Sequence, residues 1–215
     1  MFGARWLSPR LIKMRRDLSG VDLAFIRGRR VTGSSDMPAS IVVDWGNGEW
    51  PGLHAEHLLS IQYSPVISPA LIDGHYNINS PADLSKFTVI HQVDRKEWTN
   101  WKKLVSAIDI KSNEELIIED ANIAIQAAIA GQGITLGTFP WVQEEVDCGK
   151  LIKPFAQNLS PICSYYILTR PGSRDRKEIA SVCDWLHQEA KLYANTYPFT
   201  RPETPAIKKA LKLDK

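Results

Sequence analysis

Apolar side chains recur at helical spacing near both ends of the chain. Near the N-terminus these positions are Leu7, Leu11, Met14 and Leu18, and Gly20 follows them. Near the C-terminus they are Ile179, Val182, Leu186 and Tyr193. Steps of three and four positions place each set on one face of a helix. The pattern therefore predicts two amphipathic helices, over residues 7–18 and 175–193.

Between these helices, short apolar runs alternate with helical segments. The runs rich in β-branched or aromatic residues, which predict strands, are 21–26, 40–45, 61–67, 87–93, 115–119, 134–137 and 163–169. Residues 28–40 and the stretch "GLHAEHLL" (52–59) are interpreted as exposed connections. Two Ser-Pro pairs, at 68–69 and 80–81, predict helix starts because serine caps free N–H groups and proline fits the first turn. Alternating strands and helices indicate the α/β class.

The stretch "AIQAAIAGQGITLGT" (124–138) resembles a phosphate-binding loop, but its order is reversed. A dinucleotide loop needs a strand before its glycines and a helix after them. Here the alanine-rich residues 121–130 predict a helix, Gly131 suits the position just past its end, and a strand follows. With strand 115–119 this forms a βαβ unit, whose strands should be parallel.

The start of helix 121–130 is the predicted ligand-binding edge of this unit. Asp120 is placed as its N-cap, and the free N–H groups of a helix N-terminus favour anions. Thr138 ends the following strand and is placed to cap a second helix, over 139–147. We therefore expect two helix N-termini to converge on the carboxyl edge of one sheet, where α/β proteins bind ligands.

Composition sets few limits on function. The 215 residues are 44% hydrophobic and 23% charged with a net charge of +2, as in an ordinary globular protein. No apolar run is long enough to span a bilayer, and no secretory signal is recognisable. Three widely spaced cysteines form no disulfide framework and suggest a reducing cytoplasm. Residues 1–30 carry eight Lys/Arg against two Asp, a local +6, which we interpret as a solvated helix face.

Catalytic and metal-binding patterns are not found in the sequence. His54 and His57 lack a third ligand nearby, and the pair Glu144-Glu145 is interpreted as a wet helix face. There is no G-x-S-x-G elbow, no P-loop and no H-E-x-x-H motif. We therefore expect a protein that is not an enzyme and that uses no cofactor and no metal.

Seven segments together resemble a known family. They are "RWLSPRL" (5–11), "VVDWGNGEWPGLHAEHLL" (42–59), "PVISPALI" (65–72), "SPADL" (80–84), "VIHQVDRKEWTNW" (89–101), "AAIAGQGITLG" (127–137) and "GKLIKPF" (149–155). In this order they look like the effector-binding domain of LysR-type transcriptional regulators. The similarity is greatest to the branch that contains the regulators of glycine cleavage and of β-lactamase expression, and it runs from about residue 2 to residue 189.

The resemblance implies an α/β fold of two Rossmann-like lobes, similar to the type II periplasmic binding proteins and joined by two crossing strands. The crossing passages would be 87–93 and 163–169. The first lobe would comprise residues 1–90, the second lobe 91–164, the return to the first lobe 165–194, and a tail 195–215.

The resemblance also implies a small-molecule site between the lobes. Carried over by position, the ligand-binding residues would be Arg29, Asp44, Trp45, Asn47, His91, Asp120, Ala121, Asn122, Thr138 and Tyr166. The expected effector is small and carries a carboxylate or another acceptor group. For each residue, capping or packing is the alternative role.

The implied partners are a second copy of the chain, in a homodimer or higher oligomer, and DNA through a domain outside this sequence. Such regulators begin with a winged helix-turn-helix and a linker helix, so we expect no sequence-specific operator binding by these 215 residues. The dimer would pair helix 5–18 of one copy with helix 121–130 of the other.

A freestanding solute-binding protein of the same fold is the alternative function. An enzyme related to porphobilinogen deaminase is a third, without a supporting nucleophile or base cluster.

Overall fold

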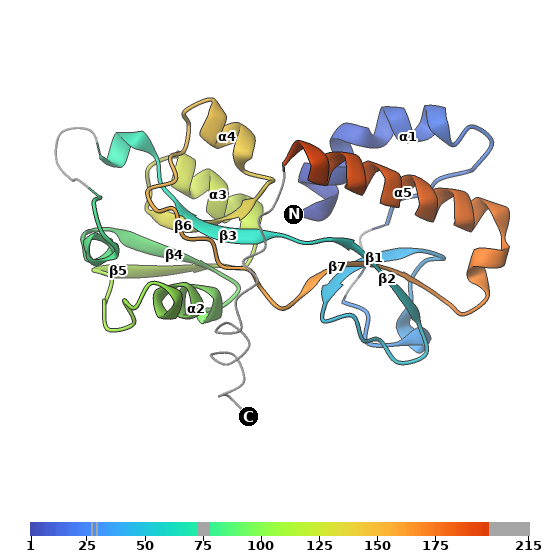
Figure 1. The fold of residues 1–215 in the computed structure, drawn as a ribbon, viewed down its shortest axis with the longest axis horizontal. Helices are drawn as coiled ribbons and strands as arrows, with labels where there is room; N and C mark the ends of the chain where they lie inside the picture. Colours follow the sequence, from blue (N-terminus) through green and yellow to red (C-terminus); the bar gives the residue numbers. More distant parts are fainter. Residues whose placement is uncertain (27, 29, 73–77, 198–215) are drawn as a thin grey trace.

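The computed structural model describes residues 1–26, 28, 30–72 and 78–197 of the chain. Its helices and strands form two α/β lobes that lie side by side (Figure 1). The strands are divided between a three-stranded and a four-stranded sheet. The expected α/β class with two lobes is therefore confirmed.

The first lobe is built on an antiparallel sheet in the order β1-β7-β2. Its strands are β1 (Val42–Gly46), β2 (His54–Leu59) and β7 (Ser164–Thr169). Helices α1 (Leu11–Asp17) and α5 (Lys177–Thr196) lie over one face of this sheet (Figure 1). A π-helical segment (Phe2–Leu7) and a 3-10 turn (Ser8–Arg10) lead into α1, so the helical region starts earlier than its apolar stripe.

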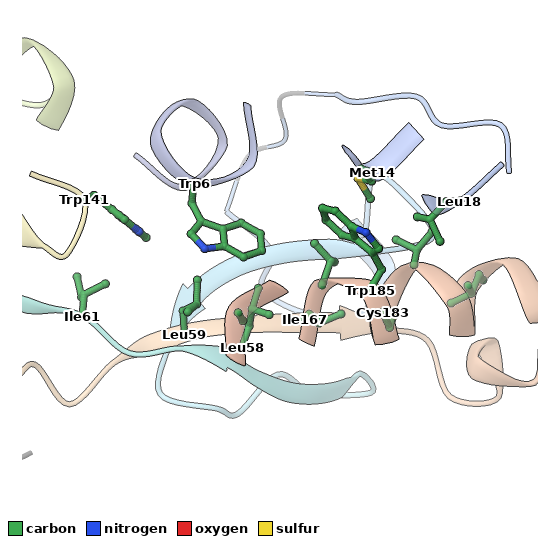
Figure 2. Packing of buried hydrophobic residues seen from close by; sticks show 14 residues of the cluster. Trp6, Met14, Leu18, Leu58, Leu59, Ile61, Trp141, Ile167, Cys183 and Trp185 are labelled. Atoms are coloured by element: carbon green, nitrogen blue, oxygen red, sulfur yellow. The ribbon is translucent and has the colours of Figure 1, made fainter. Parts of the chain in front are cut away.

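Between this sheet and its helices lies a continuous apolar core (Figure 2). Most residues of the two predicted stripes contribute to it, since Met14, Leu18, Ile179, Val182 and Leu186 are buried. Removing each such side chain from water stabilises the fold by about 1.5–3 kcal/mol, which explains why both helices stay on the sheet. The same core includes Trp141, which comes from the second lobe, so the lobes share apolar contacts.

The second lobe contains the sheet β3-β6-β4-β5. Its strands are β3 (Gln62–Val66), β4 (Thr88–Gln92), β5 (Glu114–Ile118) and β6 (Ile134–Phe139). Helices α3 (Ala121–Ile129) and α4 (Gln143–Asp147) lie on one side of it, and α2 (Lys96–Leu104) lies on the other (Figure 1). Trp98 and Trp101 of α2 are buried in a core cluster, so both rings pack in the interior of this lobe.

The predicted βαβ unit is present as β5-α3-β6. Both strands run parallel to β4, which lies between them. After α3, Gly131 adopts a left-handed conformation (φ 74°), and the N–H groups of Gly131 and Gln132 bond to the carbonyls of Ala128 and Ala127. This pattern is the Schellman motif that ends many helices. The glycine pair is thus a return turn, as predicted, and not a phosphate-binding loop.

Both Ser-Pro pairs open 3-10 turns and not α-helices. These turns are Pro69–Leu71 and Pro81–Lys86, and two further ones are Ser34–Asp36 and Ser173–Asp175. Ser80 forms a reciprocal capping box with Asp83, whereas the Ser68 side chain makes no capping hydrogen bond. The predicted cap is therefore confirmed at residue 80 alone.

Two predictions about the first lobe are wrong. Residues 21–26 form no strand, and Phe25 and Ile26 remain 54% and 59% exposed. An extended segment becomes a strand only where a neighbour takes its backbone hydrogen bonds, and neither β1 nor β2 is paired with this one. Conversely, the stretch 52–59 is not an exposed connection, because residues 54–59 form β2 and pair with β7.

The passage of the chain between the lobes also differs from the prediction. The chain leaves the first sheet at the end of β2 and enters the second at Gln62, and it returns just before β7 (Figure 1). The expected crossing at 87–93 is wrong, because β4 is an inner strand of the second sheet. With β3 and β4 both in that sheet, the change of sheet comes earlier than residue 90. Whether the predicted lobe ranges 1–90, 91–164 and 165–194 correspond to units that move separately stays a prediction.

Candidate ligand-binding site

The N-terminus of α3 is the first predicted part of the site. The Asp120 carboxylate accepts hydrogen bonds from the N–H groups of Asn122 (2.8 Å) and Ile123 (3.3 Å). These bonds keep the pKa of Asp120 below its ordinary value, since they stabilise the charged form. The predicted N-cap is therefore confirmed. The consequence is that two N–H groups that could have held an anionic ligand are already occupied.

Arg5 joins this helix end to the first lobe, and the sequence did not point to it. Its Nε donates to the Asn122 side-chain oxygen at 3.2 Å, and its Nη1 donates to the Trp141 carbonyl at 3.2 Å. The same Nη1 forms an ion pair with Glu145 at 2.6 Å, and the two side chains are only 15% and 17% exposed. Glu145 is thus not on a wet helix face, although its neighbour Glu144 is exposed.

Aromatic rings form the wall next to this ion pair. Tyr165 of β7 packs against Trp45 of β1, with ring centroids 4.8 Å apart, and against Trp141, at 5.0 Å. Phe2 stacks on the same ring at 5.5 Å. Burial raises the pKa of the Tyr165 phenol, and the nearby Asp44 carboxylate adds to this effect, so the phenol stays neutral.

Tyr166, the residue carried over from the family, points to the other face of the sheet. It packs against Trp50 and His57, with ring centroids 5.5 Å away in each case. Successive side chains of a strand alternate between its two faces, so an error of one position moves a residue to the wrong side. Tyr165, and not Tyr166, lies on the face that carries Trp45 and Trp141. The sequence signal for this face is Ile167, an apolar residue two positions after Tyr165. Because alternate residues of a strand share a face, Tyr165 lies on the same side as Ile167, which faces the core.

The carboxylate of Asp44 is engaged within the first lobe. It accepts the N–H of Val31 at 2.9 Å and the N–H of Trp45 at 2.7 Å. Asn47 accepts the N–H of Glu49 at 3.2 Å and lines a separate pocket of about 310 Å³. Asp44 therefore holds the backbone around Trp45, while Asn47 lies apart from the aromatic wall.

His91 and Thr138 belong to the sheet of the second lobe. His91 is 3% exposed on β4, with its Nε2 at 3.6 Å from Glu115. Burial lowers its pKa, and the Glu115 carboxylate opposes this effect in part. Thr138 is buried in β6 opposite Tyr63, so it does not cap the next helix, which begins at Gln143. The predicted convergence of two helix N-termini is therefore wrong.

The structure thus brings together one part of the predicted set. Trp45, Asp120, Ala121 and Asn122 lie around the junction made by Arg5, Trp141 and Tyr165, with Asp44 holding its edge. Asn47, His91, Thr138 and Tyr166 make their contacts elsewhere, and Arg29 lies outside the described residues.

In the part of the chain that the structure describes, no three His, Cys, Asp or Glu side chains are placed to bind a metal ion. The described helices include none with the length and apolar character needed to cross a membrane.

Comparison with known sequences gives relatives of one kind. The chain is 27% identical over 198 residues to the glycine cleavage system transcriptional activator of Escherichia coli K12, and this match covers 92% of the chain. It is 22% identical over 191 residues to the transcriptional activator AmpR of Enterobacter cloacae. The chain spans only 65% of the length of the first of these relatives and 64% of the second.

Solved structures share the fold. The effector domain of the regulator AmpR of Pseudomonas aeruginosa superposes with a TM-score of 0.77 at 21% identity, covering 91% of this chain and 94% of that one. The regulatory domain of CrgA from Neisseria meningitidis gives 0.72 at 15% identity, covering 88% and 94%. The fold is therefore the two-lobed, type II periplasmic-binding-protein-like fold of these domains. Residues 1–191 match the family described as the LysR substrate binding domain, and the chain belongs to this family.

Proposed function

We propose that the chain is the ligand-sensing domain of a LysR-type, DNA-binding transcriptional regulator. The observation that carries this proposal is the family match, which extends over residues 1–191. The names of the relatives, which are transcriptional activators, favour a regulator over a freestanding solute-binding protein. In this proposal the domain works in the cytoplasm and catalyses no reaction, and a separate domain of the full regulator binds DNA.

The effector would bind at the junction of the two lobes. Groups from both lobes meet there, since Arg5 and Tyr165 belong to the first lobe and Asn122 and Trp141 to the second. A ligand in contact with both lobes can favour one arrangement of them over another, which is what a sensor requires. Trp45 and Tyr165 supply an apolar wall beside this junction, and Ala121 is the first residue of α3 next to it.

A carboxylate on the effector would be held by Arg5 and not by the N-terminus of α3. The Asp120 carboxylate already takes the N–H groups of Asn122 and Ile123. The guanidinium of Arg5 uses Nε and Nη1 for its bonds, and its Nη2 donates no hydrogen bond to any described residue. A planar guanidinium with free N–H groups is well suited to a carboxylate.

A homodimer is the second part of the proposal. On α1, Ile12 is 86% exposed, and on α3, Ile123 is 59% exposed. Arg15 and Arg16 on α1 and Glu119 and Asp120 at the start of α3 are also exposed, with opposite charges. An antiparallel pairing of α1 with α3 of a second copy would cover both isoleucines and bring these charges together twice.

The site is tested by a thermal-shift screen of small organic acids. The parent chain is compared with Ala121→Trp, which fills the junction, and with Ala130→Trp, a matched change at the exposed far end of the same helix. We expect an effector acid to raise the melting temperature of the parent and of Ala130→Trp but not of Ala121→Trp. At 100 times its Kd, a ligand adds about 2.7 kcal/mol to the free energy of unfolding.

An acid that stabilises the parent and Ala121→Trp equally would place the effector elsewhere. Arg5→Gln separates the role of the guanidinium from that of the apolar wall. It should weaken binding of the acid more than binding of the corresponding amide, because only the acid gains from the cation.

A further inference from the structure

A second pocket lies at the junction of the lobes, away from the candidate site. It has a volume of about 260 Å³ and is lined by Gln62, Phe139, Pro140, Gln143, Lys153 and Asn158, with Thr196 and Tyr197 at the end of α5. None of these residues belongs to the set predicted from the sequence or to the junction around Arg5. Because α5 packs on the first sheet and Phe139 ends a strand of the second, a ligand here would contact both lobes.

Lys153 is the charged residue of this lining. Its ammonium lies 5.3 Å from the centre of the Phe139 ring, and it forms no ion pair with any carboxylate among the described residues. Burial lowers the pKa of Lys153, and no nearby anion offsets this effect. A half-buried cation of this kind is stabilised when an anion binds beside it.

Asn158 supplies an unused acceptor in the same lining. Its Oδ1 is buried and has no hydrogen-bond partner among the described residues. Buried polar atoms of proteins are nearly always paired, so an unpaired one indicates a missing donor. Other amides of the lining are committed: Gln143 donates to Asp147 at 2.8 Å, and Gln62 donates to Ser160 at 3.2 Å.

We propose that this pocket is a binding site for a small carboxylate that also carries an N–H donor, of the kind that a free amino acid presents. The carboxylate pairs with the Lys153 ammonium, and the N–H donor satisfies Asn158 Oδ1. The volume of about 260 Å³ limits the ligand to a small metabolite. This inference is independent of the proposed effector site, and it gives the domain a second position at which a ligand bridges the lobes.

The test uses the full chain and a thermal-shift screen of the common L-amino acids one by one, followed by isothermal titration of those that stabilise it. Each of these is compared with the matching acid that lacks the amino group and the matching amine that lacks the carboxylate. We expect the amino acid to bind most tightly, the acid more weakly, and the amine not to bind. If no amino acid stabilises the chain, the proposal is overturned.

Variants assign the binding to the pocket. Lys153→Met keeps the apolar stem and should weaken binding by about 10- to 100-fold, the usual range for losing a charged hydrogen bond. Lys153→Arg should retain most of the affinity, and Lys150→Met, at an exposed lysine outside the lining, should retain all of it. Asn158→Leu removes the acceptor, so the amino acid and its deamino acid should then bind equally.

Ala121→Trp separates this inference from the proposed function. Binding that survives Ala121→Trp and is lost in Lys153→Met supports the second pocket. Binding that is lost in Ala121→Trp but unchanged in Lys153→Met overturns it and assigns the amino acid to the junction around Arg5.

Discussion

Single carboxylates stabilise several turns of this chain, and Asp83 is the example with backbone and side-chain partners together. Its oxygens accept the N–H groups of Asn79 (3.1 Å) and Ser80 (3.0 Å) and the ammonium of Lys86 (2.6 Å). The ion pair with Lys86, followed by the two N–H groups, keeps the pKa of Asp83 far below its ordinary value of 3.8. All of these contacts favour the charged form, so their contribution to stability depends on pH.

We expect Asp83→Asn to lower the free energy of unfolding at neutral pH by about 1 kcal/mol, the order of effect of a lost capping interaction at a helix start. Because the folded-state pKa is depressed, this contribution is complete above the unfolded value and is lost as pH falls towards the folded one. Urea titrations at neutral and at strongly acidic pH measure the difference. It should shrink at acidic pH, and Asp109→Asn, at an exposed position, should have little effect at either pH.

His91 also makes the fold less stable in acid, but for a different reason and in a higher pH range. Within the part of the chain that the structure describes, neither of its buried ring nitrogens has a hydrogen-bond partner, and Glu115, Arg95 and Lys102 carry the charges around it. Burial lowers its pKa below the ordinary 6.5, so the unfolded chain binds a proton that the folded chain does not. By linkage, stability falls as the pH drops through the ordinary pKa towards the folded one.

His91→Leu should remove this part of the pH dependence. Melting temperatures recorded between about pH 5 and pH 8, the range in which histidine titrates, should fall less steeply with acid for His91→Leu than for the parent. His54→Leu is the control, because the His54 side chain is 58% exposed. Equal slopes for the parent and His91→Leu would show that this histidine does not contribute.

At the scale of elements, the turn after α3 decides how closely that helix approaches the sheet. Gly133 has a φ of 156°, and a Cβ built there would lie 2.4 Å from the carbonyl oxygen of Thr88 on β4. The contact is with backbone, which cannot move aside as a side chain can. Ala124, Ile125 and Ala128 of α3 are fully buried, so a shift of the helix would disturb packing along its length.

Gly133→Ala should therefore destabilise the second lobe by more than its backbone strain alone, which is of the order of 1–3 kcal/mol. Gly149→Ala is the matched control, because Gly149 is also left-handed (φ 73°) but has no atom within 4 Å of a built Cβ. Chemical denaturation of both variants compares the two costs. A loss of stability that is no larger for Gly133→Ala would mean that the clash with Thr88 is relieved at little cost.

At the scale of the whole molecule, contacts between distant segments hold the two lobes together. Arg5 reaches Asn122 across 117 positions of the sequence, and Trp141 of the second lobe lies in the core of the first. The two lobes are also joined by the passage from β2 into β3 and by the passage into β7. Any dimer that covers α1 and α3 would therefore contact both lobes of each copy.

The proposed dimer is tested at Ile12. Placing a charge at this 86% exposed position of α1, as in Ile12→Glu, should prevent the pairing and give a monomer. Ile162→Glu, at a 67% exposed position in the loop before β7, should leave the dimer intact. Light scattering coupled to size-exclusion chromatography reports the mass of each. A monomeric parent at high concentration, or a dimeric Ile12→Glu, contradicts the proposed interface.

The sequence by itself determined the elements whose signals are local. The stripes of α1 and α5, the Asp120 cap, the cap at Ser80 and the glycine turn after α3 each depend on residues within one or two helical turns. The family resemblance extended this to the two-lobed fold, because seven segments in a fixed order are hard to match by chance.

Only the tertiary structure decided which segments pair and which face a side chain takes. Residues 21–26 were apolar enough for a strand but have no partner, whereas 54–59 became one because β7 lies beside it. Tyr165 rather than Tyr166 faces Trp45 because the register of β7 against β1 fixes the alternation. Arg5 meets Glu145 only after both lobes have formed. Such contacts leave no periodic signal in the sequence, since they join residues that only the packing of distant elements brings together.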